Sequence, residues 1–191
     1  MRLTQPEPNL ADGVVELRPW THADVPALVA ALDGDAVISA WLDQVPQPFT
    51  ADNGVRFVDG SNARWAEGTH ASFALVDAVT GELLGSAGAH VVPEGHDVVE
   101  IDYWVAEAGR GRGAATRAAV LVSRWAIESV GAERVQLRAD VENVGSCRVA
   151  EKAGFVREGV MRSVRRNDRQ DGRRIDWALY SLLPGDLDRP T

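Results

Sequence analysis

The sequence predicts an α+β domain built on a mixed, mostly antiparallel twisted sheet of about seven strands, with helices on both faces. Helical segments come first and are followed, between residues 71 and 105, by strands in which apolar and polar residues alternate. Two strand–helix units then follow, and a hairpin over residues 155–183 closes the domain. A doubly wound parallel sheet would instead alternate strand and helix throughout.

Composition is that of one globular domain. The chain has 191 residues, 45% of them hydrophobic and 25% charged, and a net charge of −8, which argues against non-specific nucleic-acid binding. No apolar run approaches the roughly 18 residues of a membrane span, and the start carries no secretory segment. With Cys147 as the single cysteine, a reducing cytoplasm is expected. We expect a flexible arm over 1–12, one domain over 13–184 and a tail over 185–191.

The first half of the chain predicts one strand and then helices. Residues 14–18 alternate and are ended by Pro19. Thr21 and Asp24 are spaced as a capping box before a helix over 25–32, and a short helix is expected over 36–42. Thr50 is a plausible N-cap for a third helix over 51–67.

From residue 71 onward apolar residues recur at every second position, as they do in strands. Strands are predicted at 71–76, 82–92 and 98–105, and the last of these places Glu100, Asp102 and Trp104 on one face. A helix over 113–130, a strand over 134–141 and a helix over 144–152, capped by Asn143, follow. Residues 155–164 and 173–183 predict the closing hairpin, joined by a polar loop.

Three glycines alternate with two arginines where the strand over 98–105 gives way to a helix. A helix N-terminus leaves backbone N–H groups unpaired and carries partial positive charge, so the segment from Gly109 to Thr116 suits a phosphate. It is neither a dinucleotide fingerprint, which needs its third glycine one place later, nor a P-loop. The alternative is a glycine-rich turn without a ligand.

Two spaced motifs together resemble the GNAT acyltransferases. Arg110-x-x-Gly113-x-Ala115 is similar to the acyl-CoA signature of that superfamily. Asn143-x-x-Ser146, followed by Gly154-Phe155, is similar to the RimJ/RimL-type branch. The resemblance covers roughly residues 14–183. It implies a sheet split between strands four and five, acetyl-CoA in that split and transfer of an acetyl group to an amine.

The resemblance also implies roles for individual residues. The N–H of Val105 would donate to the thioester carbonyl. Asn143 would bind the pantetheine arm, and Ser146 would stabilise the departing thiolate; the alternative for Ser146 is that it only fills the helical turn. The pyrophosphate would be bound by the residues of the loop, which are Arg110, Gly111, Arg112, Gly113, Ala114, Ala115 and Thr116. Arg112 is equally well explained as a solvent-facing side chain.

Two carboxylates are candidates for the base that takes the proton of the amine. The resemblance favours Glu100, and Asp102 stands where the branch usually has glycine, so the choice between Glu100 and Asp102 stays open. Both could instead be solvated or paired with arginines. Many GNAT enzymes use a tyrosine as the acid that protonates the departing thiolate. The matching position here is Ala150, so that acid is missing.

Among the tryptophans, Trp41 is the one expected beside the acceptor.

The sequence therefore predicts an acetyl-CoA-dependent N-acetyltransferase without a metal, because its four histidines lack ligand spacing. The acceptor is a protein N-terminal amine or a small-molecule amine, no membrane or nucleic-acid partner is expected, and family habit alone suggests a homodimer. The missing tyrosine favours a rival hypothesis, a CoA-binding regulatory module without catalysis. An RNA-binding glycine–arginine segment is a weaker third, given the acidic balance.

Overall fold

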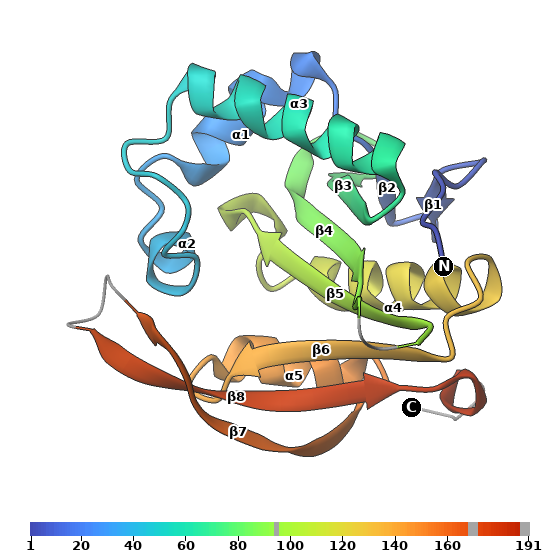
Figure 1. Cartoon of the computed structure of the whole chain (residues 1–191). Helices are drawn as coiled ribbons and strands as arrows, with labels where there is room; N and C mark the ends of the chain where they lie inside the picture. Colours follow the sequence, from blue (N-terminus) through green and yellow to red (C-terminus); the bar gives the residue numbers. More distant parts are fainter. Residues whose placement is uncertain (94–95, 168–171, 188–191) are drawn as a thin grey trace.

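The computed structural model describes residues 1–93, 96–167 and 172–187, and within them one eight-stranded sheet carries helices on both faces (Figure 1). The strand order is β1-β2-β3-β4-β5-β6-β8-β7. All the pairings are antiparallel except the one between β5 and β6. The α+β class is confirmed, and the strand count is eight because a short strand, β1, was not predicted. The bounds of the strands are β1 (Leu10–Ala11), β2 (Val15–Pro19), β3 (His70–Asp77), β4 (Leu83–Val91), β5 (Val98–Val105), β6 (Arg134–Asp140), β7 (Val156–Asn167) and β8 (Arg173–Leu182).

The helices agree closely with the predicted segments, and two of the predicted N-caps form their expected bonds. Thr50 accepts a bond from the N–H of Asn53, and Asn143 accepts one from the N–H of Ser146, as N-caps do. The bounds are α1 (Val25–Leu32), α2 (Ala36–Trp41), α3 (Ala51–Glu67), α4 (Ala114–Glu128) and α5 (Val144–Lys152). None of these helices is long and apolar enough to cross a bilayer.

Two hydrophobic clusters lie on opposite faces of the sheet. The larger one packs α4 against β2 to β6, with Trp65, Phe73 and Trp125 in edge-to-face contact at centroid separations of 5.2–6.1 Å. The smaller one packs α1, α2 and α3 against the other face, around Trp20 and Phe49. Alternation along β5 therefore sends Tyr103 to the α4 side and Trp104 to the α1–α3 side.

The segment expected to be a loose N-terminal arm is partly packed. Leu3 is 1% exposed, and its N–H donates to the carbonyl of Gly68 at 2.8 Å, just beyond the end of α3. Leu10 and Ala11 pair with β2 as strand β1. Composition suggested a loose segment because Pro6 and Pro8 interrupt it, whereas Leu3 and β1 pack against the rest of the domain. Of the expected tail, residues 184–186 form a turn of 3₁₀-helix, and 188–191 lie outside the described residues.

Candidate functional site: a split in the sheet

The sheet opens between β5 and β6. Their parallel pairing covers only Val98 to Glu100 against Arg134 to Gln136, after which the two strands separate. A cavity of about 920 Å³ lies in this opening. Its walls come from α2, β5, the glycine–arginine loop (residues 109–116), β6, α5 and the β7–β8 hairpin, so most of the fold contributes to one site.

The open edge of β5 presents unpaired backbone groups to the cavity. The N–H of Val92 donates to the carbonyl of Val98, and the N–H of Ala106 donates to that of Leu84. In an antiparallel ladder the bonding direction alternates, so the even residues of β5 bond to β4 and the odd residues face away from it. Ile101, Tyr103 and Val105 therefore turn their N–H and C=O groups toward the split.

The glycine–arginine loop begins where β5 ends and delivers the chain to α4. Gly111 and Gly113 have φ of +71° and +76°, a left-handed conformation that glycine adopts without strain. No side chain caps α4 at Gly113, which leaves the N–H groups of its first turn for a ligand. Six predicted residues of this loop line the cavity: Arg110, Gly111, Gly113, Ala114, Ala115 and Thr116.

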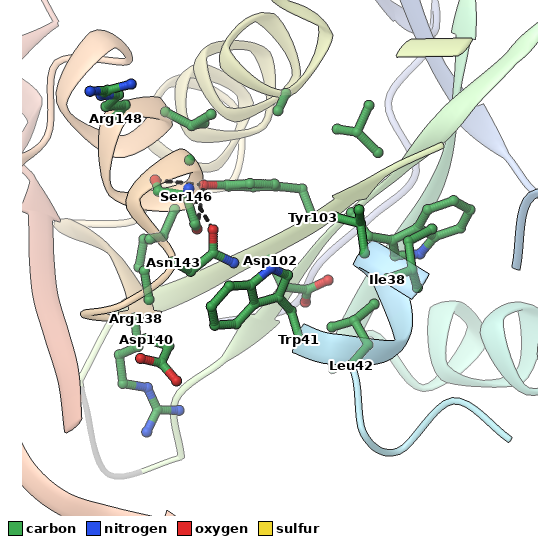
Figure 2. Close-up of a pocket in the computed structure, with 18 of the residues that line it drawn as sticks. Ile38, Trp41, Leu42, Asp102, Tyr103, Arg138, Asp140, Asn143, Ser146 and Arg148 are labelled. Atoms are coloured by element: carbon green, nitrogen blue, oxygen red, sulfur yellow. Dashed lines mark hydrogen bonds between the residues drawn. The ribbon is translucent and has the colours of Figure 1, made fainter. Parts of the chain in front are cut away.

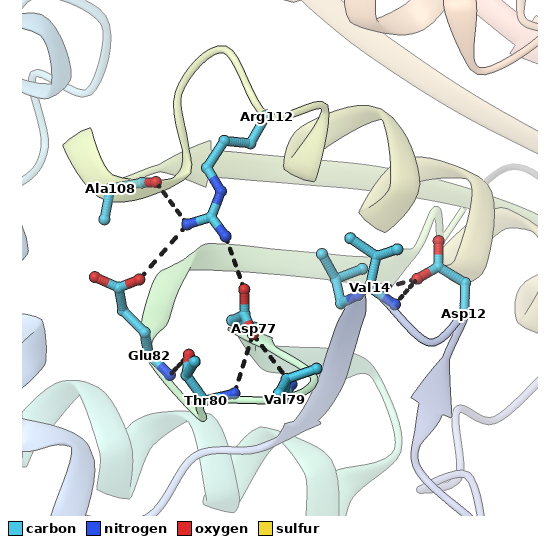
Figure 3. Close-up of polar contacts among 9 residues, drawn as sticks. Asp12, Val14, Asp77, Val79, Thr80, Glu82, Ala108 and Arg112 are labelled. Carbon is cyan, nitrogen blue, oxygen red and sulfur yellow. Dashed lines mark hydrogen bonds and ion pairs between the residues drawn. The ribbon is translucent and has the colours of Figure 1, made fainter.

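The two arginines of the loop are both held by carboxylates. Arg110 lines the cavity and donates to Asp35, the N-cap of α2, at 2.6 Å. Arg112 turns outward instead and donates to Asp77 at 2.8 Å and to the carbonyl of Ala108 at 3.2 Å, with Glu82 nearby at 3.5 Å (Figure 3). The structure thus brings Arg110 to the site, while the guanidinium of Arg112 lies away from it.

Ser146 sits in the first turn of α5 and faces the cavity together with Asn143 (Figure 2). The side-chain oxygen of Asn143 accepts the N–H of Ser146 at 3.0 Å, which leaves the Asn143 amide NH₂ free for a second partner. The hydroxyl of Tyr103 reaches Ser146 from β5, 2.9 Å from Oγ and 3.1 Å from the carbonyl oxygen.

Sequence reasoning missed Tyr103. Strand alternation put it on the same face as Val105, but no local motif joins it to Ser146, 43 residues later. The position that a helical tyrosine would have filled, Ala150, is fully buried in the core.

The two candidate carboxylates differ sharply in their surroundings. Glu100 is 8% exposed, and its oxygens accept bonds from Arg138 Nη2 at 2.6 Å, Arg138 Nε at 2.9 Å and Gln136 Nε2 at 2.8 Å. Asp102 lines the cavity, where solvent reaches it, and no bond to its carboxylate is found among the described residues. The bonds from Arg138 and Gln136 thus satisfy both oxygens of Glu100, and among the described residues the carboxylate of Asp102 is left without a hydrogen bond.

The environment of Asp102 also changes its acidity. The protein walls around the cavity desolvate the carboxylate and raise its pKa above the ordinary value of 3.8, and the charge of Glu100 adds to this effect. His90 and Arg64 oppose it, with the smaller net influence. A carboxylate with a raised pKa is a stronger base, as an amine-deprotonating group requires.

Aromatic and apolar side chains enclose the end of the cavity beyond Asp102. Trp41 lines the cavity there, with Ile38 and Leu42 beside it on and after α2 (Figure 2). On the opposite wall Arg138 stacks over the ring of Trp177, 4.5 Å from its centroid. Arg165 of β7 donates to Asp43 at 2.6 Å and so ties the hairpin to the segment after α2. No group of three or more potential metal ligands occurs among the described residues.

Comparison with known proteins identifies the class to which this fold and site belong. The family model of the acetyltransferase (GNAT) domain matches residues 15–156, so the chain is a member of the GNAT acetyltransferase family. The resemblance seen in Arg110-x-x-Gly113 and Asn143-x-x-Ser146 is therefore confirmed at the level of the family.

Individual relatives and a solved structure agree with this family. The uncharacterized N-acetyltransferase p20 of Bacillus licheniformis is 26% identical over 160 residues, 79% of this chain and 87% of that protein. The protein named as ribosomal N-acetyltransferase YdaF of Bacillus subtilis (strain 168) is 33% identical over 103 residues, 54% of this chain and 55% of its own. The structure of the microcin C7 self-immunity acetyltransferase MccE in complex with acetyl-CoA and AMP shares the fold, with a TM-score of 0.79 at 16% identity over 90% and 93% of the two chains.

Proposed function

We propose that this acetyltransferase moves an acetyl group directly from acetyl-CoA to a primary amine while both substrates are bound. The observation that carries the proposal is the open edge of β5, which leads from the unpaired backbone of Val105 to the uncapped N-terminus of α4. An extended amide-bearing arm can pair with such an edge, and a pyrophosphate can accept the N–H groups at its end. A pantetheine diphosphate has both parts.

The residues present suit the pyrophosphate, the pantetheine arm and the thioester of acetyl-CoA. The N–H of Arg110 already donates to the carbonyl of Glu107 at 3.1 Å, so the pyrophosphate is left the N–H groups from Gly111 to Thr116 and the side chain of Arg110. The NH₂ group of Asn143 is left for the pantetheine. The N–H of Val105 donates to the thioester oxygen, where negative charge develops during attack. Ser146 stabilises the departing thiolate with its hydroxyl. A solved structure of the same fold holds acetyl-CoA, which supports this assignment.

Asp102 is the base in this proposal. As the amine nitrogen forms its bond to the thioester carbon, its proton passes to the Asp102 carboxylate, directly or through one water. The C–S bond then breaks and sulfur keeps the electron pair. Glu100, favoured from the sequence, serves instead to hold Arg138, since both of its oxygens already accept bonds.

The acceptor is a protein N-terminal amine or a small-molecule amine. The relative YdaF is named as a ribosomal N-acetyltransferase, and this name favours the first class. The free carboxylate of Asp102, set among Trp41, Trp104 and Trp177, suits an ammonium group on an apolar or aromatic body in either class.

An assay of free CoA release with a thiol reagent tests the proposal across peptides with varied N-termini and a panel of small amines. At least one acceptor should raise the release rate well above the hydrolysis background, and Asp102→Asn should remove that increase. A second function, CoA binding without catalysis, is favoured by the alanine at position 150. It would be supported if CoA binds with micromolar affinity and no acceptor stimulates release.

A further inference from the structure

The hydroxyl of Tyr103 makes a contact that packing alone does not require. The ring packs against the larger hydrophobic cluster, a place that phenylalanine would fill equally well. The hydroxyl extends beyond it to the first turn of α5, where both of its neighbours, Oγ at 2.9 Å and the carbonyl oxygen at 3.1 Å, belong to Ser146 (Figure 2).

This contact constrains where the Ser146 proton can point. Burial raises the pKa of Tyr103 to about 12, so the phenol keeps its proton at neutral pH. A neutral phenol has one proton to give and two acceptors on Ser146 that compete for it. When the proton goes to Oγ, the serine hydroxyl must direct its own proton elsewhere. Ser146 lines the cavity, and an anionic sulfur there would be the strongest acceptor in reach.

We propose that Tyr103 is a positioning residue: its O–H donates to Ser146 Oγ, and this leaves the Ser146 proton free to donate to the thiolate of CoA. The inference rests on the proposed function for the identity of the thiolate. In the reaction the C–S bond breaks with its electron pair on sulfur, the amine proton goes to Asp102, and the Tyr103–Ser146 pair stabilises the anion without giving up a proton. Tyr103 lies on β5 and Ser146 on α5, so the pair joins the strand at one side of the split to the helix that follows β6.

The direct test is the pKa of the CoA thiol in the complex with enzyme, followed by the ultraviolet absorbance of the thiolate. It needs no acceptor. We expect wild-type enzyme to lower the thiol pKa below that of free CoA. Tyr103→Phe should raise it again by about one unit, and Ser146→Ala by at least as much, because a hydrogen bond to a charged group is worth about tenfold or more in the equilibrium.

The double variant separates positioning through Ser146 from an independent effect of Tyr103. If Tyr103 acts through Ser146, Tyr103→Phe/Ser146→Ala should show the same thiol pKa as Ser146→Ala alone. The chain's second tyrosine supplies a matched control: Tyr180 is buried in the core, its hydroxyl lies 3.4 Å from Glu151, and it does not line the cavity. Tyr180→Phe should leave the pKa of the bound thiol unchanged.

Turnover gives a second readout. With an active acceptor, Tyr103→Phe should lower kcat about tenfold and change the KM for acetyl-CoA less than twofold, since the bond strengthens only as charge reaches sulfur. An unshifted thiol pKa in Tyr103→Phe, or additive shifts in the double variant, would overturn the inference. If CoA binds with an ordinary thiol pKa in wild-type enzyme, the inference fails while the cofactor assignment stands; absence of CoA binding defeats both.

Discussion

Arg110 donates to Asp35 at 2.6 Å, and this bond joins the glycine–arginine loop to α2, the helix whose residues Ile38 and Trp41 line the cavity. Asp35 uses its other oxygen to cap α2 through the N–H of Ile38 at 2.9 Å. Its burial opposes ionisation, but the bonds from Ile38 and Arg110 outweigh that and hold its pKa below the ordinary value. A pyrophosphate that engages Arg110 must compete with this carboxylate, so the two ends of the cavity are linked.

Changing Asp35 to asparagine tests this competition. Asparagine keeps the N-cap but removes the charge that holds Arg110, so CoA should bind several-fold more tightly, and Arg110→Ala should weaken binding about tenfold. Isothermal titration calorimetry measures both. Arg112→Ala is the matched control, because its guanidinium lies outside the cavity, and it should alter CoA affinity least (Figure 3). Weaker CoA binding by Asp35→Asn would contradict the competition.

Asp102→Asn should lower kcat by about a hundredfold or more, the usual contribution of a positioned general base. In wild-type enzyme the rate should rise with pH through the Asp102 pKa, which desolvation by the cavity walls raises above the ordinary aspartate value, because only the carboxylate accepts a proton. The variant should lose that rising limb. Glu100→Gln is the comparison: it should keep the limb, and its own effect should come from an Arg138 left without its carboxylate. A rising limb that persists in Asp102→Asn would remove Asp102 from the mechanism.

Gly88 makes room for the Asp102 carboxylate. A Cβ at this position of β4 would lie 2.9 Å from both Asp102 oxygens and 3.2 Å from the carbonyl oxygen of Ala71. Gly88→Ala should therefore turn Asp102 away and reduce kcat at least tenfold, while the affinity for CoA stays within about twofold. Gly159→Ala serves as control, since its Cβ would meet nothing within 4 Å. Steady-state kinetics with calorimetry for CoA would show whether the loss is confined to turnover.

The ion pair of Glu158 with Arg134 should make the stability of the fold depend on pH in the acid range. Bonds from Arg134 at 2.7 Å and from Ser181 at 2.8 Å lower its pKa to about 2. A depressed pKa stabilises the folded state above the unfolded value of 4.5, and this contribution disappears as the pH falls from there toward 2. Because the side chain is 37% exposed, we expect only about 1 kcal/mol from it.

Thermal melts of wild type and Glu158→Gln measure this contribution across pH. The difference in Tm between the two proteins should be largest near neutral pH and should shrink as the pH approaches 2. A difference that grows in acid would reverse the sign of the argument.

Leu3 should contribute to the stability of the whole domain. Its side chain is 1% exposed within the larger cluster, so Leu3→Ala should cost about 2–4 kcal/mol in the free energy of unfolding. Urea denaturation measures it. Thr4→Ala, exposed and one residue away, is the control and should change stability by less than about 0.5 kcal/mol.

Much of the fold was predictable because its signals are local. Thr50 and Asn143 mark helix starts by their own chemistry, and strand alternation fixed which side chains of β5 share a face. Strand β1 escaped prediction because two residues carry no periodicity, and the packing of Leu3 depends on partners far away in the sequence. The hairpin was predicted to turn from residue 165, but β7 continues to Asn167.

In the site, too, the local motifs were predictable and the long-range contacts were not. The glycine–arginine loop and the Asn143-x-x-Ser146 turn were readable, since each lies within a few consecutive residues. The partners of the charged groups could not be predicted, because they are far apart in the sequence. Arg138 bonds to Glu100 across 38 residues, and Arg110 bonds to Asp35 across 75 residues. Tyr103 was missed for the same reason. Only the folded chain shows which polar groups are already satisfied and which remain free for substrates.

The separation of β5 from β6 makes the sheet two plates, one of five strands and one of three, held together in the sheet by three residue pairs (Figure 1). A bound arm that pairs with β5 would add the missing rungs, and its binding free energy would then count toward folding. The melting temperature should therefore rise with the concentration of added CoA. Hydrogen exchange at the amides of Ile101, Tyr103 and Val105 should slow first as that concentration rises.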